Sequence, residues 1–212
     1  MNKKRVVAFI DGFNLYHSVH ELGTEYRHLI WLNVYSLTRA LIHPNRDELY
    51  EVLYFTSIAH WNEPEKRKRH DDYIAATQAS GAVAIVGSFK KVNRKCSKCN
   101  KTYKAFEENG TDVAIAAKIV DYAARNLFDK ALLFSADSDL TPVVSQVLAA
   151  HPDKEIYIVT TSSRIRNAKG LRGQSSGFIS IGAENFAKNL LPESINCDDR
   201  VIEIPETYKR LG

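Results

Sequence analysis

Short apolar runs that alternate with amphipathic stretches dominate the chain. Residues 6–10 read Val-Val-Ala-Phe-Ile and stop at Asp11 and Gly12. Such a run is typical of a strand buried on both faces, and the residues from about Asn14 onward favour a helix after it. Further strands are predicted at 49–56, 82–86, 131–134 and 155–160, with a sixth candidate at 178–181.

Helices are predicted between these strands. Glu63-Pro64-Glu65 suits a helix start, because proline tolerates the first turn and acidic side chains complement the helix dipole. This helix should run to about Ser80 and end at Gly81. The other expected helices cover 33–41, 143–149 and 184–190, and one begins at Thr111. The alternation predicts an α/β fold, with a three-layer parallel sheet of about five strands and helices on both faces.

The chain is expected to form one domain with additions. Its 212 residues suit a single hydrophobic core. We assign residues 1–191 to this domain, with an insertion at 87–105, and residues 192–212 to a C-terminal extension. Residues 201–204 of the extension could add an edge strand.

Composition indicates an ordinary globular protein, with 44% hydrophobic and 25% charged residues. No apolar run reaches the roughly 18 to 20 residues of a membrane span or the length of a signal-peptide core. Three cysteines cannot make a disulfide framework and fit a reducing compartment. We therefore expect a cytoplasmic protein with no membrane partner.

The distribution of charge says more than the net charge of +4. Between Phe89 and Tyr103 there is no acidic residue, and a local basic patch of this kind binds phosphate backbones. A solvated lysine-rich loop is the alternative. The cations of the patch are Lys90, Lys91, Arg94, Lys95, Lys98 and Lys101.

The same segment carries Cys96-Ser97-Lys98-Cys99, which offers two thiolates at the spacing of zinc ligands. A structural zinc site usually has four ligands. His70, Cys197 or a second subunit could complete one, so structural zinc and a homodimer both stay open. The alternative is a reduced turn without a metal.

Four aspartates occupy positions that a parallel sheet would bring to one edge. Asp11 follows the first strand, Asp137 and Asp139 follow the fourth, and Asp112 begins a helix. Ligands of open α/β sheets bind outside the carboxyl ends of the strands, where the strand order reverses. Each aspartate alone could be a turn former or a helix cap. Four carboxylates about 5 Å apart, however, repel by about 3 kcal/mol per pair at an effective dielectric near 20. A bound Mg²⁺ or Mn²⁺ would reverse that sign.

Three ordered motifs resemble the NYN domain family of PIN-like ribonucleases. They are Asp-Gly-Phe-Asn at 11–14, Glu-Asn-Gly-Thr-Asp-Val at 108–113 and Ser-Ala-Asp-Ser-Asp at 135–139, and the similarity spans roughly 6–159. The resemblance implies a PIN-like sheet, cleavage of RNA that depends on Mg²⁺ or Mn²⁺, and a cytoplasmic role in RNA processing or turnover. Asn109 stands where the family often has lysine and Ala136 where it often has glycine, which affects loop geometry and removes no carboxylate.

The resemblance also implies roles for individual residues. Asn14 becomes a polar positioner, and Glu108 and Ser135 become flanking members of the site. A cation held there would activate water and offset charge on the leaving oxygen, so no nucleophilic side chain is needed. The metal ligands carried over are Asp11, Asp112, Asp137 and Asp139.

A second candidate RNA contact is the glycine-bearing stretch 170–177 with the cations Arg164, Arg166 and Arg172. It matches no phosphate-binding loop, and a mobile surface loop is the alternative. We expect the RNA to be single-stranded.

Other functions fit less well. A phosphatase that forms an aspartyl-phosphate would need a second acid two residues after Asp11, where Phe13 stands. An ATPase would need a glycine-lysine phosphate loop, which the chain lacks. The serious rival is an RNA- or protein-binding module that kept the fold and lost turnover.

Overall fold

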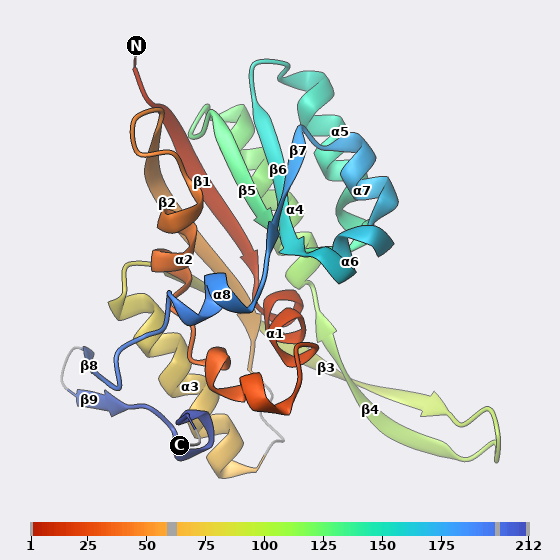
Figure 1. The fold of residues 1–212 in the computed structure, drawn as a ribbon. Coiled ribbons are helices and arrows are strands. Elements are labelled where there is room, and N and C mark those ends of the chain that lie inside the picture. Colours follow the sequence, from red (N-terminus) through yellow and green to blue (C-terminus); the bar gives the residue numbers. More distant parts are fainter. Residues whose placement is uncertain (1, 59–62, 198–199, 211–212) are drawn as a thin grey trace.

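A mostly parallel sheet of seven strands forms the centre of the protein (Figure 1). The structure is a computed structural model that describes residues 2–58, 63–197 and 200–210, with the side chains of 105–109 and 167 left out. The strand order is β4-β3-β2-β1-β5-β6-β7. The bounds are β1 (Lys4–Asp11), β2 (Asp47–Ser57), β3 (Val83–Lys95), β4 (Thr102–Asn109), β5 (Lys130–Phe134), β6 (Glu155–Thr161) and β7 (Gly177–Ile181).

The α/β class is confirmed, but the expected number of about five strands is wrong. The candidate strand at 178–181 is present as β7 and pairs in parallel with β6. The strand that was not expected is β4, which pairs antiparallel with β3 and makes the sheet mixed. The buried first strand is confirmed, since Val6 to Ile10 have no exposed surface.

The segment predicted as an insertion at 87–105 is instead part of a long β-hairpin that projects from the body (Figure 1). β3 pairs with β2 up to Gly87 and then continues, without a break, into its pairing with β4. At the tip, the Cys96 amide donates to the Lys101 carbonyl over 2.9 Å, and Asn100 has φ of 56°. Asparagine tolerates this left-handed conformation, so the turn can join β3 to β4.

Helices cover both faces of the sheet, as the sequence predicts. One apolar cluster joins β1 and β5 to helices that include α4 (Thr111–Ala124), α5 (Thr141–Ala150) and α7 (Lys169–Gln174). The other cluster joins the opposite face to α1 (Gly12–His20), η1 (Thr24–Ile30), α2 (Val34–Leu41) and α8 (Ala183–Ala187). Short connections are η2 (Ser138–Leu140) and α6 (Ser162–Asn167). The stretch around 170–177 therefore contains helix α7 and the start of β7, not a plain loop.

A third cluster attaches the C-terminal segment to α3 (Pro64–Ala79). It includes Trp31, Ala76 and Cys197. The strand expected at 201–204 is present as β9 (Arg200–Glu203), but it pairs with β8 (Ser194–Cys197) and not with the edge of the main sheet. After β9 comes η3 (Glu206–Tyr208), which lies against η1. In the described part of the chain, no helix is long and apolar enough to span a membrane.

Candidate active site

The site lies where the strand order reverses at the carboxyl edge of the sheet. β1 is flanked by β2 and β5, and both pairings are parallel. From β1 the chain builds β2 and β3 outward on one side, and β5, β6 and β7 on the other. Asp11 ends β1, and Ser135 follows β5 directly. The pairing of β1 with β5 therefore brings Asp11 and the loop after β5 to the same edge of the sheet.

A small hydrogen-bond network fixes the centre of this edge. The hydroxyl of Ser135 donates to Asp11 Oδ2 over 3.2 Å and accepts from the Asp137 amide over 3.1 Å. Asp11 and Ser135 are 5% and 1% exposed, so both hydrogen bonds lie in surroundings where unsatisfied polar groups are costly. The network joins the end of β1 to the loop after β5 and fixes the Asp11 carboxylate in place.

Capping explains part of the aspartate pattern. Asp11 Oδ1 accepts from the Asn14 amide over 2.9 Å at the start of α1, and Asp137 Oδ1 accepts from the Asp139 amide over 2.9 Å at the start of η2. Asp139 does not cap α5, because Leu140 holds the N-cap position of that helix. Asp112 lies in the first turn of α4, where its charge complements the helix dipole. Each cap uses one carboxylate oxygen and does not require the other three acids.

Electrostatics shows that the four carboxylates belong to one neighbourhood. Burial, followed by the negative charges of Asp137, Asp11 and Asp139, raises the pKa of the Asp112 carboxyl above its ordinary value of 3.8. Among the described residues, no cation is a cause of this shift. The Asp112 residue is exposed overall, so water screens part of the repulsion. The ionised acids disfavour one another, as the sequence argument requires.

The donor set suits Mg²⁺ or Mn²⁺ held with retained water. Carboxylate oxygens are the hard ligands that these ions prefer, and Mg²⁺ is usually bound through one or two carboxylates plus water and substrate phosphate. Among the described side chains, no three from His, Cys, Asp or Glu are gathered closely enough to share an ion. Retained water and a substrate phosphate would have to complete the coordination of an ion held by these acids.

Comparison with known proteins gives the family. A model of the NYN domain matches residues 5–182, well over half of the chain. The chain belongs to the NYN domain family. This is a family of PIN-like nucleases.

A crystal structure of a protein of unknown function from Vibrio parahaemolyticus shares the fold. Its TM-score is 0.54 at 16% identity, and the alignment covers 85% of this chain and 94% of that one. At this identity the likeness concerns the fold alone. No match was found among the curated proteins.

In this NYN domain, Asn14 connects three segments around the acids. Its Oδ1 accepts from the Ala136 amide over 3.1 Å and from Arg164 Nη1 over 2.7 Å. Arg164 also forms an ion pair with Glu21, at 2.8 Å between Nη2 and Oε1. Arg164 had been predicted to contact RNA, but here its guanidinium holds α6 against α1. Sequence reasoning missed Glu21, because nothing in the chain signals a partner 143 positions away.

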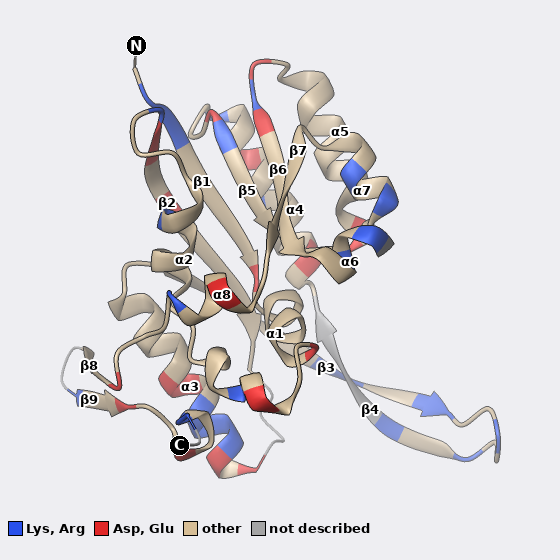
Figure 2. Ribbon diagram, viewed as in Figure 1, with Lys and Arg blue, Asp and Glu red and all other residues tan. Residues whose placement is uncertain are grey.

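The basic residues of the hairpin lie apart from the body of the NYN domain (Figure 2). Lys90, Lys91 and Lys95 are exposed, as are Arg94 and Lys98. Because successive strand residues face opposite sides, Lys90 and Lys91 present charge on both faces of the hairpin. A second group of cations lies on α6 and α7 and comprises the exposed Arg166 and Arg172.

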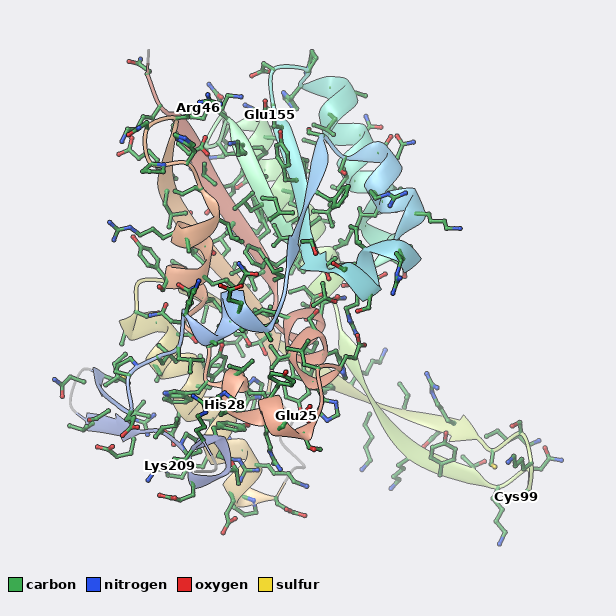
Figure 3. All side chains as sticks on the ribbon, viewed as in Figure 1. Glu25, His28, Arg46, Cys99, Glu155 and Lys209 are labelled. Atoms are coloured by element: carbon green, nitrogen blue, oxygen red, sulfur yellow. The ribbon has the colours of Figure 1, made fainter. Side chains whose placement is uncertain are left out.

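The thiols of Cys96 and Cys99 lie at the tip of the same hairpin, far from the body (Figure 3). Hydrogen bonds from the backbone of Cys99 and Lys98 lower the pKa of the Cys96 thiol. His70 hydrogen bonds Thr56, and Cys197 is buried in the third cluster, so neither reaches this tip. Within the described part of the chain, no third His, Cys, Asp or Glu joins the two thiols. Zinc stays a prediction that depends on ligands from a second subunit.

Two more residues at the site were missed by sequence reasoning. The hydroxyls of Ser57, at the end of β2, and Thr111, directly before Asp112, lie 3.2 Å apart. A Cβ at Gly87 would come within 2.7 Å of Ser57 Oγ, so glycine keeps β3 close to this pair. The contact sets the position of the first turn of α4. Glu108 lies in β4 opposite Phe89, and its side chain is outside the described residues.

Proposed function

We propose that this NYN domain is a ribonuclease that hydrolyses RNA phosphodiester bonds with Mg²⁺ or Mn²⁺ held by Asp11, Asp112, Asp137 and Asp139. One observation supports this most: burial, and after it the charges of the other three acids, raise the pKa of Asp112, so the four carboxylates interact. Repulsion among acids has no structural benefit, whereas it favours binding of a divalent cation. The family and its nuclease character agree with this assignment.

The residues of the site have separate roles. A divalent cation, when bound, would supply Lewis acidity toward the phosphoryl oxygens and a more acidic water. Ser135 fixes the Asp11 carboxylate through its 3.2 Å hydrogen bond. Asn14, supported by Arg164, fixes the loop that carries Asp137 by accepting from the Ala136 amide. The exposed Asp112 and Asp139 retain rotamer freedom to approach the ion with its RNA phosphate.

The exposed cations supply the attraction for RNA. Lys90, Lys91 and Lys95 on the hairpin and Arg166 on α6 are exposed. Contacts of this kind hold a phosphate backbone and depend on salt. Single-stranded RNA is the proposed form, because an unpaired strand can bend from the hairpin to the sheet edge. The protein would act in the cytoplasm.

Cleavage of a labelled single-stranded RNA in the presence of Mn²⁺ tests the proposal. Wild type should cut, whereas Asp11→Asn and Asp137→Asn should lose at least about a hundredfold in rate, as expected for loss of an electrostatic contribution to the transition state. Both variants should fold, since asparagine can still accept the capping hydrogen bonds. Equal turnover of wild type and both variants would reject the proposal that these acids catalyse RNA cleavage.

The alternative, a binding module without turnover, has its own signature. Such a module would bind RNA in a salt-sensitive way, and Asp11→Asn would not weaken binding. Neutralising Lys90, Lys91 and Lys95 to glutamine would reduce the salt slope by about two to three in either case. The two functions are therefore separated by cleavage and not by affinity.

A further inference from the structure

A cavity of about 330 Å³ lies between α1, α3 and the C-terminal segment. Its walls come from parts of the chain far apart in sequence, including Phe13 of α1, Arg27 of η1, Arg69 of α3 and Tyr208 of η3. Cavities of this size bind small organic groups. None of the four acids is among its described lining residues.

The lining combines cations with aromatic rings. Among the described lining residues, Arg27, Lys66 and Arg69 carry positive charge and none carries negative charge. Lys66 also pairs with the exposed Glu63 on its own helix, so the two arginines are the stronger anchors. Several aromatic rings, including those of Tyr16 and Tyr208, complete the lining. A ligand that fits must offer an anionic group and a flat ring.

Tyr208 closes the cavity from a segment outside the family match, which ends at residue 182. Arg69 hydrogen bonds the Tyr208 phenol, and burial raises the pKa of that phenol. The side of the molecule that carries η1 and η3 is visible in Figure 3, where the labelled Lys209 follows Tyr208 and His28 lies on η1. The cavity is therefore built by the C-terminal segment together with the nuclease domain.

The cavity reaches the first turn of α1, next to one of the acids. Gly12 and Phe13 line it, and they directly follow Asp11. Thr56 lines it from β2, whereas the next residue, Ser57, contacts Thr111 on the opposite face of that strand. An RNA strand that runs from Asp11 to the cavity would therefore pass the first turn of α1.

We infer that this cavity binds one nucleotide of the RNA strand, with the base against the tyrosines and a phosphate at Arg27 and Arg69. The inference takes its substrate class from the proposed ribonuclease function. Arginine suits phosphate because its planar fork donates two parallel hydrogen bonds. Stacking on aromatic rings accepts any base, so the cavity sets the position of the strand and the distance from the bound nucleotide to the cut.

Binding measured on the full chain without cleavage tests the inference. The Asp11→Asn protein in EDTA is titrated into a short fluorescein-labelled single-stranded RNA, with fluorescence anisotropy as the readout. Arg27→Gln should weaken binding by about tenfold, and Tyr208→Ala by about fivefold or more. Arg39→Gln, an equal charge loss on α2, and Tyr50→Ala, an exposed tyrosine on β2, are the matched controls because neither lines the cavity.

A competition arm separates a nucleotide within a strand from a free nucleotide. The 5′-monophosphates of A, C, G and U should displace the RNA weakly, and Arg27→Gln should abolish that displacement. RNA affinities of the cavity variants that equal those of their controls would overturn the inference. The inference would also be overturned if the substitutions changed displacement by the monophosphates but left the affinity for the RNA strand unchanged.

Failure of the ribonuclease proposal would look different. If wild type never cuts RNA but the cavity variants still bind more weakly than their controls, the nucleotide site stands and the nuclease does not. If Arg27→Gln with intact Asp11 cuts with unchanged KM, the nuclease stands and the nucleotide site does not. The expected result is a KM raised about tenfold, with a smaller change in kcat.

Discussion

Changing Asp112 to asparagine should stabilise the protein in the absence of divalent metal. The carboxylate has a raised pKa, so its ionised form is disfavoured in the folded state, and the charge destabilises the fold at pH 7. Three acids repel it, and a pair that includes an exposed carboxylate is worth about 0.2–1 kcal/mol after solvent screening. Their sum is about 0.6–3 kcal/mol. For a domain of this size, each 1 kcal/mol raises the melting temperature by about 2–4 °C.

Divalent metal should reverse the order of stability of wild type and Asp112→Asn. Wild type gains stability with the concentration of Mn²⁺ relative to its Kd, by about 2.7 kcal/mol at a hundredfold excess over Kd. Asp112→Asn lacks one of the acids and should gain less. The variant should therefore melt above wild type in EDTA and below it in saturating Mn²⁺.

Thermal melting with and without Mn²⁺ measures both effects. Asp121→Asn is the control on the same helix, since Asp121 pairs with Arg125 and does not influence the pKa of Asp112. It should show no crossover. A lower melting temperature for Asp112→Asn in EDTA, or an equal rise of both proteins with Mn²⁺, would refute the electrostatic reasoning.

Two further predictions concern residues at the two ends of β1. Gly12→Ala should destabilise by about 1–3 kcal/mol in urea unfolding, because its Cβ would come within 2.7 Å of the Phe55 carbonyl oxygen; Gly173→Ala, which meets nothing within 4 Å, should be neutral or stabilising. Asp129→Asn should lose about 1 kcal/mol at pH 7 after discounting for exposure, because Arg5 donates to that carboxylate over 2.7 Å and lowers its pKa. Above the ordinary pKa of 3.8, wild type should keep its full stability advantage over Asp129→Asn, and this advantage should vanish as the pH falls below 3.8. A stability difference between the two proteins that persists at low pH would show another cause.

The centre of the fold could be predicted because its signals are local. The buried run 6–10 and the strand at 131–134 are apolar and are followed within three residues by Asp11 and Asp137, and parallel strands deliver their carboxyl ends to one edge. That geometry placed Asp11 and Asp137 correctly at the reversal of the sheet. It could not show that both also act as helix caps, because capping depends on where the next helix begins.

The hairpin and the helices after β6 could not be predicted in the same way. β4 follows a run of basic residues that looked like a charged insertion, and its strand is revealed by its pairing with β3, from Ser88 opposite Asn109 to Lys95 opposite Thr102. Glycines at 170 and 173 suggested a loop, yet Leu171 is buried against the first cluster and holds α7 in place. Tertiary packing overrode the local propensity.

The cavity was also beyond sequence reasoning, for a different reason. Arg27, Arg69 and Tyr208 carry no motif, and they meet only because η1, α3 and η3 pack together. Arg164 shows a related limit: its charge suggests an RNA contact, which stays a prediction, but the sequence does not reveal its ion pair with Glu21. Charge alone does not tell which cation is already paired.

Anomalous diffraction from a crystal grown with Mn²⁺ and a short RNA that cannot be cleaved tests the central claim most directly. The account predicts a manganese peak at the carboxyl edge between β1 and β5, within direct or water-mediated contact of Asp11 and Asp137, with a phosphate of the RNA beside it. A strand of RNA bound at this edge with no manganese among the four acids would contradict the account.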